Sequence, residues 1–306
     1  MNLNILALVK KGLSRIELFS RLIVRRPLHD YQLVPARAII DSVLHRRGLE
    51  FAVLFPRQSG KNETQAHVEA YLLNLCQFRG GEIVKAQPTF QPQALNALRR
   101  LISVLDRQWI SLGWRVHEGY QVRMGRACMT FFSANSQASV SGATASLLLE
   151  CDEAQDVREA DWDKKFLPMG ASTNATVVYW GTAWTSRTLL AKTIRHLRAL
   201  EAQDSVPRVF VVTPEQVAAV NPAYGRYVAR EVAKKGRQHP LIKTQFFNEE
   251  IDGEGGMFPA ARRALMRCPS ACMRCCWTWP ARTKAPAATA HPRSRCWRTP
   301  SAMRPR

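Results

Sequence analysis

The chain has 306 residues, of which 44 are Lys or Arg and 24 are Asp or Glu, so its formal net charge is +20 at pH 7. A hydrophobic content of 46% and a charged content of 22% are ordinary for a protein with a buried core, which excludes disorder over most of the chain. No apolar run is long enough to span a membrane, and the start lacks the charge order and cleavage site of a secretory signal. The charge favours a polyanionic partner, with nucleic acid ahead of a membrane surface.

Between about residues 28 and 255, short strand-like runs alternate with longer helical patterns. Apolar runs bounded by turn residues predict strands at 51–55, 81–86, 146–151, 176–181 and 208–213. Helical spacing of apolar residues predicts helices at 63–76 and 94–109, and residues 120–132 have the pattern of a hairpin around Gly125 and Arg126. Strands that alternate with helices favour an α/β fold, with a mainly parallel sheet covered by helices on both faces.

The sequence PRQSGK (residues 56–61) lies between a predicted strand and a predicted helix, an arrangement that surrounds nucleotide phosphates. Gly60 would let the backbone approach the phosphates closely, and Lys61 would reach the terminal ones. The full GxxxxGK[ST] pattern is not met, because Phe55 stands where the first Gly belongs and Asn62 replaces the hydroxyl residue expected at Mg²⁺. Taken alone, such a loop is also typical of an ordinary turn.

Two carboxylates follow an apolar strand in the sequence LLLECDEAQ. Asp152 and Glu153 are expected at the carboxyl edge of a parallel sheet, where ligands collect in open α/β folds. One of these carboxylates can hold Mg²⁺, directly or through water, and its neighbour can polarise the attacking water. Thr182, at the tip of the strand at 176–181, can sense the γ-phosphate and pass hydrolysis on to the nucleic-acid-binding side. Each feature alone also fits a plain strand end, but together with the loop they predict an ATP-hydrolysing P-loop site.

In this order, the three elements resemble the ATPase domain of the large terminase subunit of tailed bacteriophages, the motor that packages DNA into the prohead. The matching segments run from LHDYQ to QFFNEEIDGEGGMFP and cover about residues 28 to 259. The resemblance implies a P-loop NTPase fold of the RecA/ASCE type, with ATP and Mg²⁺ as cofactors. It implies that Gln32 contacts adenine, and that Arg57 senses or stabilises the γ-phosphate as a catalytic residue beside Lys61 and Glu153.

The resemblance also implies which residues bind the nucleotide and the metal. The family's variant phosphate loop commonly lacks the first Gly, and its match here assigns nucleotide binding to Gln58, Ser59, Gly60, Lys61 and Asn62. Asp152 and Asn62 are implied as Mg²⁺ ligands, and the sequence GTA is implied as the coupling motif that contains Thr182. Arg99 or Arg100 could be the arginine that ring motors supply to a neighbouring subunit, although both also fit a solvated helix face.

Partners and location follow from the resemblance alone. It implies double-stranded phage DNA, a portal protein and a small terminase subunit as partners, and a homo-oligomeric ring when assembled. It also implies the cytoplasm of a bacterial host, with no membrane. Asn62 in place of the usual hydroxyl residue favours slow but real ATPase activity.

Residues 260–306 differ in composition from the rest of the chain. No acidic residue follows Glu254, and residues 262–306 contain 11 Lys or Arg, 6 Pro and 5 of the 8 Cys. Five possible zinc ligands there lack clean zinc-site spacing, namely Cys268, Cys272, Cys275, Cys276 and His291. We therefore expect an N-terminal basic helical segment (1–27), a P-loop ATPase domain (28–259) and an aberrant, disordered basic tail (260–306).

The composition of this tail fits a basic DNA-binding segment, but Trp277, Trp279 and Trp297 among Cys, Pro and Arg are more typical of an out-of-frame translation of GC-rich DNA. Back-translating residues 266–284 with G- or C-ending codons, and reading from each third base, gives an apolar strand that ends in an acidic residue. That product resembles the first metal-binding strand of the terminase nuclease domain. We hypothesise a frameshifted, truncated terminase, and we expect no nuclease activity because no carboxylate beyond Glu254 can hold a catalytic metal pair. Residues 1–261 carry 33 basic and 24 acidic residues, a net charge of +9.

Two other functions fit parts of the same pattern. A superfamily-2-like helicase fragment also contains DEAQ and a third motif with Thr, but a helicase needs a second RecA-like domain, for which the chain leaves no room. An inactive prophage remnant would bind DNA or a capsid partner through its basic surface without turning over ATP. ATP turnover, and stimulation by duplex rather than single-stranded DNA, separate the three.

Overall fold

The computed structural model describes residues 3–110, 113–135 and 142–251 of the chain. The interpretations of residues 260–306 as a disordered, out-of-frame tail lie outside these residues. Among the described helices, none is long and apolar enough to cross a membrane.

The described chain is built on a sheet of eight strands in the order β3-β4-β5-β2-β6-β7-β1-β8. The strands are β1 (Glu50–Leu54), β2 (Gly81–Gln87), β3 (Trp114–His117), β4 (Gln121–Met124), β5 (Ala127–Ser133), β6 (Leu148–Cys151), β7 (Thr176–Gly181) and β8 (Val209–Val211). From β5 to β8 in this order all neighbours pair in parallel, whereas β4 pairs antiparallel with β3 and β5. The prediction of a mainly parallel sheet is confirmed.

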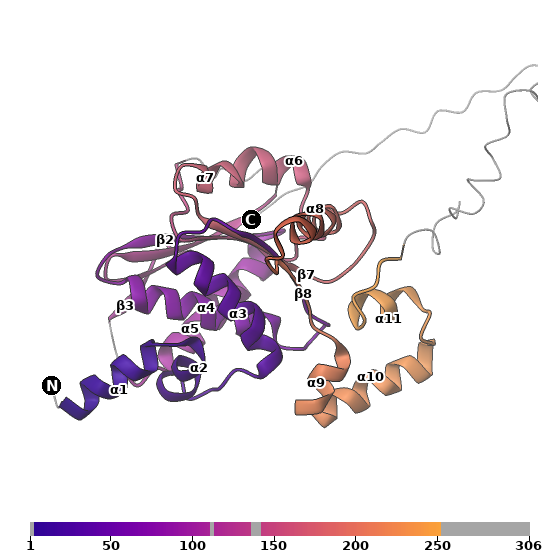
Figure 1. Cartoon of the computed structure of the whole chain (residues 1–306), viewed down its shortest axis with the longest axis horizontal. Coiled ribbons are helices and arrows are strands. Elements are labelled where there is room, and N and C mark those ends of the chain that lie inside the picture. Colours follow the sequence, from indigo (N-terminus) through magenta and orange to yellow (C-terminus); the bar gives the residue numbers. More distant parts are fainter. Residues whose placement is uncertain (1–2, 111–112, 136–141, 252–306) are drawn as a thin grey trace, which may run out of the picture. The chain divides into compact units, whose positions relative to one another are not determined.

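Helices precede, separate and follow the strands (Figure 1). The longer ones are α1 (Leu3–Leu13), α3 (Asp30–Leu44), α4 (Lys61–Cys76), α5 (Leu95–Asp106), α8 (Leu189–Asp204) and α10 (Pro222–Lys235). The shorter ones are α2 (Ile16–Leu18), α6 (Glu159–Asp161), α7 (Pro168–Ala171), α9 (Pro214–Val220) and α11 (Pro240–Gln245), with π-helical turns η1 (Phe19–Ile23), η2 (Phe90–Ala94) and η3 (Trp162–Phe166). Proline opens α7, α9, α10 and α11, where its missing N–H costs no helical hydrogen bond.

Side chains of the central strands alternate between two apolar layers, one on each face of the sheet. Along β1, Phe51 and Val53 join the layer that contains α3, α4 and α5, whereas Ala52 and Leu54 join the layer that contains α7 and α8. Figure 1 shows these two sets of helices on opposite sides of the sheet. Strands buried on both faces read as continuous apolar runs, which is the signal on which the sequence prediction rests.

The boundaries of the predicted elements agree with the observed ones to within a few residues, and one observed strand has no predicted counterpart. Each of the five predicted strands is present, and the antiparallel pairing of β4 with β5 on either side of Gly125 and Arg126 confirms the predicted hairpin. No sequence pattern predicts β3. It is an edge strand with three exposed residues, and its alternation of apolar and polar residues extends over only four positions, the shortest run that can indicate a strand.

The topology fixes where the predicted site residues meet. Strands β2, β6, β7 and β1 lie side by side and run parallel, so their carboxyl ends share one edge of the sheet. At that edge the phosphate loop (56–61) leaves β1, Asp152 and Glu153 follow β6, and Thr182 follows β7. Elements far apart in the sequence are thereby brought within side-chain reach of one another.

Candidate nucleotide-binding site

The loop between β1 and α4 turns sharply into the helix. Gln58 (φ 62°) and Gly60 (φ 95°) both have left-handed backbone conformations. A Cβ on Gly60 would lie 2.7 Å from Nε2 of Gln32, so conformation and space both require glycine there. No side chain of the described residues caps the N-terminus of α4. The first N–H groups of this helix are therefore available to an anion.

Residues at the start of α3 hold the loop in this shape. The hydroxyl of Tyr31 donates to the carbonyl of Ser59 (2.9 Å), and Nε2 of Gln32 donates to the carbonyl of Gly60 (3.2 Å). The other end of the Gln32 amide accepts from the N–H of His29 (2.9 Å). Gln32 is thus buried with both ends of its amide engaged, and its contact with adenine stays a prediction.

Lys61, the first residue of α4, reaches both carboxylates that follow β6. Its Nζ lies 2.8 Å from Oδ1 of Asp152 and 2.5 Å from Oε1 of Glu153. Burial alone would lower the pKa of Lys61, but the two carboxylates outweigh burial and raise it above its ordinary value. Burial would raise the pKa of Asp152, but the charges of Lys61 and Lys85 lower it well below its usual range. Lys61 and Asp152 are therefore both charged at neutral pH.

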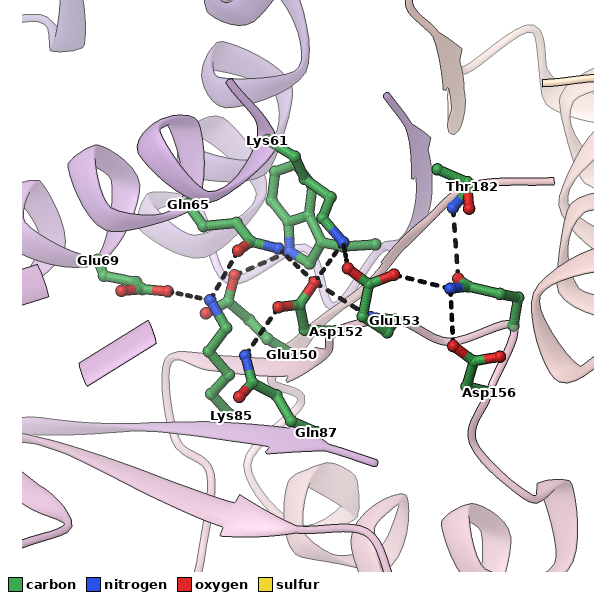
Figure 2. A network of polar contacts seen from close by, with 12 residues as sticks. Lys61, Gln65, Glu69, Lys85, Gln87, Glu150, Asp152, Glu153, Asp156 and Thr182 are labelled. Atoms are coloured by element: carbon green, nitrogen blue, oxygen red, sulfur yellow. Dashed lines mark hydrogen bonds and ion pairs between the residues drawn. The ribbon is translucent and has the colours of Figure 1, made fainter. Parts of the chain in front are cut away.

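Three N–H donors besides Lys61 hold the carboxylate of Asp152 (Figure 2). Nε2 of Gln65 donates to Oδ1 (3.0 Å), Nε2 of Gln87 donates to Oδ2 (2.7 Å), and the backbone N–H of Glu153 donates to Oδ1 (3.0 Å). Sequence reasoning misses both glutamines. Gln65 lies one helical turn after Lys61 on the same face of α4, and that spacing is the one sequence signal for it.

Gln155 connects the carboxylate of Glu153 to the tip of β7. Its Nε2 donates to Oε2 of Glu153 (2.7 Å) and to Oδ2 of Asp156 (3.2 Å), while its Oε1 accepts from the N–H of Thr182 (3.3 Å). A Cβ at Gly181 would collide with Oε1 of Gln155, so the glycine makes room for this contact. One side-chain amide therefore connects the ends of β6 and β7, a role that the sequence did not suggest for Gln155.

A pocket of 590 Å³ lies at this edge of the sheet, a size ordinary for a small-molecule site. It is lined by seven predicted site residues, namely Arg57, Gln58, Gly60, Lys61, Asn62, Glu153 and Thr182. Three others lie outside the lining and are buried, namely Gln32, Ser59 and Asp152. The structure thus brings the predicted set together, with the buried members supporting those that face the pocket.

Arg57 is held from the far end of the described chain. Its backbone N–H donates to the carbonyl of Gln245 in α11 (2.7 Å), and its Nη1 donates to Oε1 of the same residue (3.3 Å). The hydroxyl of Tyr224 in α10 donates to the carbonyl of Arg57 (3.1 Å). The guanidinium stays exposed at the pocket, so it can meet an anion there.

A layer of buried charge lies between α4 and the sheet, next to Asp152 (Figure 2). Nζ of Lys85 donates to Oε1 of Glu69 (2.6 Å) and to Oε1 of Gln65 (2.9 Å). Oε1 of Glu150 accepts from the indole N–H of Trp180 (2.9 Å). Burial, and the neighbouring Glu69, raise the pKa of Glu150 well above its ordinary value against the pull of Lys85.

The residues present fit a magnesium ion. Within the described residues, no three or more His, Cys, Asp or Glu side chains form a metal-binding group. Mg²⁺ is usually held by one or two carboxylates, waters and substrate phosphates rather than by an all-protein cage. Asp152 is ionised, Glu153 is beside it, and Asn62 is exposed in the first turn of α4. These are the hard oxygen donors that the ion prefers.

The described chain has the mainly parallel sheet and the strand-loop-helix unit of the P-loop NTPase fold. Comparison with solved structures makes the fold more specific. The Thermus phage P74-26 large terminase ATPase domain matches with a TM-score of 0.54 and 14% identity, over 74% of this chain and 96% of that one. The large terminase of bacteriophage HK97 matches with a TM-score of 0.56 and 17% identity, over 74% of this chain and 52% of that one.

A third match is a large terminase from a thermophilic bacteriophage in complex with ADP, with a TM-score of 0.52 and 12% identity. It covers 72% of this chain and 53% of that one, so the chain spans about half the length of the two longer terminases. No protein-family model and no curated protein matches the sequence. The fold of the described chain is thus that of the large-terminase ATPase domain, as the sequence resemblance predicts.

Proposed function

We propose that this chain is an ATP-hydrolysing motor of the large-terminase kind, which translocates double-stranded viral DNA into a prohead. The observation that carries this proposal is the meeting of Lys61 with Asp152 and Glu153 beside an uncapped helix N-terminus. The fold supports it, because one of the structures with the same fold is a large terminase in complex with ADP. ATP and Mg²⁺ are therefore the proposed cofactors.

The two carboxylates differ in exposure, and this difference suits them to different roles. The side chain of Asp152 is 2% exposed and tightly hydrogen-bonded, which suits an anchor for the metal, whereas that of Glu153 is 30% exposed and faces the pocket. Glu153 is therefore the group that can bind and polarise the attacking water. When bound with ATP, Mg²⁺ would neutralise charge that develops on the phosphate oxygens.

The loop residues bind the nucleotide in this proposal. Lys61 moves between the carboxylates and the terminal phosphates, because a bound triphosphate offers it a competing anion. Arg57 meets the γ-phosphate from the exposed side of the loop, and Asn62 offers its amide oxygen to the metal. Gln155 contacts both Glu153 and the N–H of Thr182. Through this contact Thr182 senses hydrolysis of the γ-phosphate at Glu153, and the change is transmitted to the DNA-binding side.

The macromolecular partners in this proposal are double-stranded phage DNA, a portal protein and a small terminase subunit, with other copies of the chain in a ring. The net charge of +9 on residues 1–261 supports a polyanionic partner. A helicase fragment and an inactive, DNA-binding remnant are the outcomes against which the proposal is tested.

The proposal is tested by measuring phosphate release from Mg-ATP by the full chain, alone and with duplex or single-stranded DNA. We expect slow hydrolysis that duplex DNA stimulates more than single-stranded DNA does. Stimulation by single-stranded DNA alone would favour the helicase alternative. DNA binding without ATP turnover would favour the remnant and contradict the proposed motor.

A second measurement concerns Gln155 as a positioning residue. Gln155→Leu removes the donor to Glu153 and the acceptor for the Thr182 N–H, while its volume stays similar. Loss of a hydrogen bond to a charged group predicts turnover about 10-fold lower. The affinity for ADP should not change, because Gln155 does not belong to the phosphate loop. A parallel loss of ADP affinity and thermal stability would show a merely structural role.

A further inference from the structure

A cluster of three charged residues, Arg26, Glu63 and Arg100, lines the pocket and has no role in the function proposed above. Nη1 of Arg26 lies 3.2 Å from Oε1 of Glu63, and Nη1 of Arg100 lies 3.3 Å from Oε2 of Glu63. Arg26 precedes α3, Glu63 belongs to the first turn of α4, and Arg100 belongs to α5. All three line the pocket that contains Lys61.

The cluster carries one more positive charge than its carboxylate can compensate. The side chains of Arg26 and Arg100 are 43% and 46% exposed, whereas that of Glu63 is 12% exposed. A guanidinium has five N–H donors in a fixed fork, and one contact with Glu63 leaves most of them for a ligand. The carboxylate of Glu63 is therefore the buried partner, and the guanidinium groups of Arg26 and Arg100 face the pocket.

The position of Arg26 is fixed by the protein core. The ring of His67, one turn after Glu63 in α4, is fully buried. Its Nδ1 lies 2.9 Å from the carbonyl of Glu63, and its Nε2 lies 3.1 Å from the carbonyl of Arg26. His67 thereby ties the backbone of Arg26 to the same helix whose N-terminus faces the pocket.

A polyphosphate in this pocket carries more negative charge than Lys61 and Arg57 together can compensate, because Asp152 and Glu153 also contact that lysine. Arginine forks bind phosphate oxygens through paired N–H donors. We propose that Arg26 and Arg100 form a phosphate clamp, which binds the polyphosphate chain of the nucleotide in the same chain's pocket while Glu63 holds both guanidinium groups in place. This inference rests on the proposed nucleotide-binding function.

The clamp assigns Arg100 to its own chain rather than to a neighbouring subunit. Its neighbour Arg99 provides a matched control, since Arg99 is exposed on the same helix, contacts Asn96 (3.4 Å) and lies outside the pocket lining. Binding of a fluorescent ADP to the full chain is measured for wild type, Arg26→Ala, Arg99→Ala, Arg100→Ala and Arg100→Lys. Losing one charge-assisted contact predicts about 10-fold weaker binding for Arg26→Ala and Arg100→Ala. Arg99→Ala should bind like wild type, and Arg100→Lys should lie between, because it keeps the charge but loses the fork.

Competition by inorganic tripolyphosphate tests whether the contact is with phosphate. We expect Arg100→Ala to weaken the binding of tripolyphosphate and the binding of ADP by the same factor. Weaker ADP binding with unchanged tripolyphosphate binding would assign the arginine to the base or ribose and overturn the clamp. So would ATP turnover restored by mixing Arg100→Ala with Lys61→Ala chains, because only an arginine acting across subunits can be supplied in that way.

Failure of the clamp and failure of the proposed function give different results. If wild type binds ADP and Arg100→Ala binds it equally well, the clamp is wrong and the nucleotide site stands. If wild type does not bind ADP, the proposed function is wrong and the clamp is wrong with it. Melting temperatures of all variants, which should agree with wild type within a few degrees, identify any variant whose binding is lost through unfolding.

Discussion

Lys61→Ala is expected to reduce Mg-ATP turnover by about 10³-fold, the largest loss of activity that the site predicts for one side chain. Within the described part of the chain, Lys61 is the one cation that contacts both Asp152 and Glu153, and it also stands at the N-terminus of α4. Lys61→Ala removes the ammonium that, in the proposed function, connects the nucleotide phosphates to these carboxylates. The measurement is the steady-state rate of phosphate release with saturating Mg-ATP and duplex DNA.

A control must separate lost chemistry from lost stability, because Lys61→Ala also removes a counter-charge of the buried Asp152. Lys61→Ala leaves Asp152 with the more distant Lys85 as its counter-charge, and adding Asp152→Asn removes the buried charge altogether, so the double variant should recover part of the melting temperature and none of the turnover. Lys192→Ala, at an exposed lysine of α8, should match wild type in both. Turnover that survives in Lys61→Ala would show that the site lies elsewhere.

The sequence predicts those parts of the site that follow directly from strand ends. A buried strand, a turn and a helix are local features, so the loop before Lys61 can be read from adjacent residues. Asp152, Glu153 and Thr182 follow apolar strands, and a parallel sheet necessarily gathers such positions at one edge. The phosphate loop is recognisable although Phe55 and Asn62 depart from its usual pattern.

Contacts made by long side chains across strands and helices escape the sequence. Gln155 and Gln87 are ordinary polar residues near strand ends, and only the order of β2, β6 and β7 aims them at the carboxylates. Arg100 has the spacing of an exposed helix face, yet the packing of α5 against α4 turns it toward Glu63. Gln32 shows the opposite case, because the resemblance implies a ligand contact where the structure has a contact with the loop backbone.

Lys85 is the residue that sequence reasoning overlooks most completely, and it gives the largest expected effect on stability. It lies within β2, 1% exposed, with Nζ 2.6 Å from the equally buried Glu69. Leaving a buried carboxylate without its partner typically costs about 3–5 kcal/mol. Lys85→Met is therefore expected to lower the free energy of unfolding by about that amount, as measured by urea denaturation followed by circular dichroism.

The pH dependence of this loss distinguishes an electrostatic cause from poor packing. Lys85 lowers the pKa of Glu150, which burial and Glu69 already hold well above its ordinary value, so Lys85→Met raises that pKa further. A carboxyl whose pKa is higher in the folded state adds stability below its unfolded pKa and loses it as pH rises through the folded pKa. The destabilisation by Lys85→Met should therefore shrink toward acidic pH, where the carboxyl of Glu150 is protonated in both the folded and the unfolded state.

Removing both charges provides the decisive comparison. The double variant Lys85→Met, Glu69→Gln has neither the buried ammonium nor its partner carboxylate. It should therefore be considerably more stable than the single variant Lys85→Met. A double variant no better than the single one, with a loss independent of pH, would mean that the methylene stem of Lys85 matters and its charge does not. If the double variant recovers only part of the free energy of unfolding, and the remaining loss still shrinks toward acidic pH, that loss is assigned to Glu150, the other carboxyl in this layer. Glu150 lies in β6 and Asp152 follows that strand after one residue, and Lys85 lowers the pKa of both carboxyls, so the buried charges under the sheet edge and the charge of the candidate site are coupled.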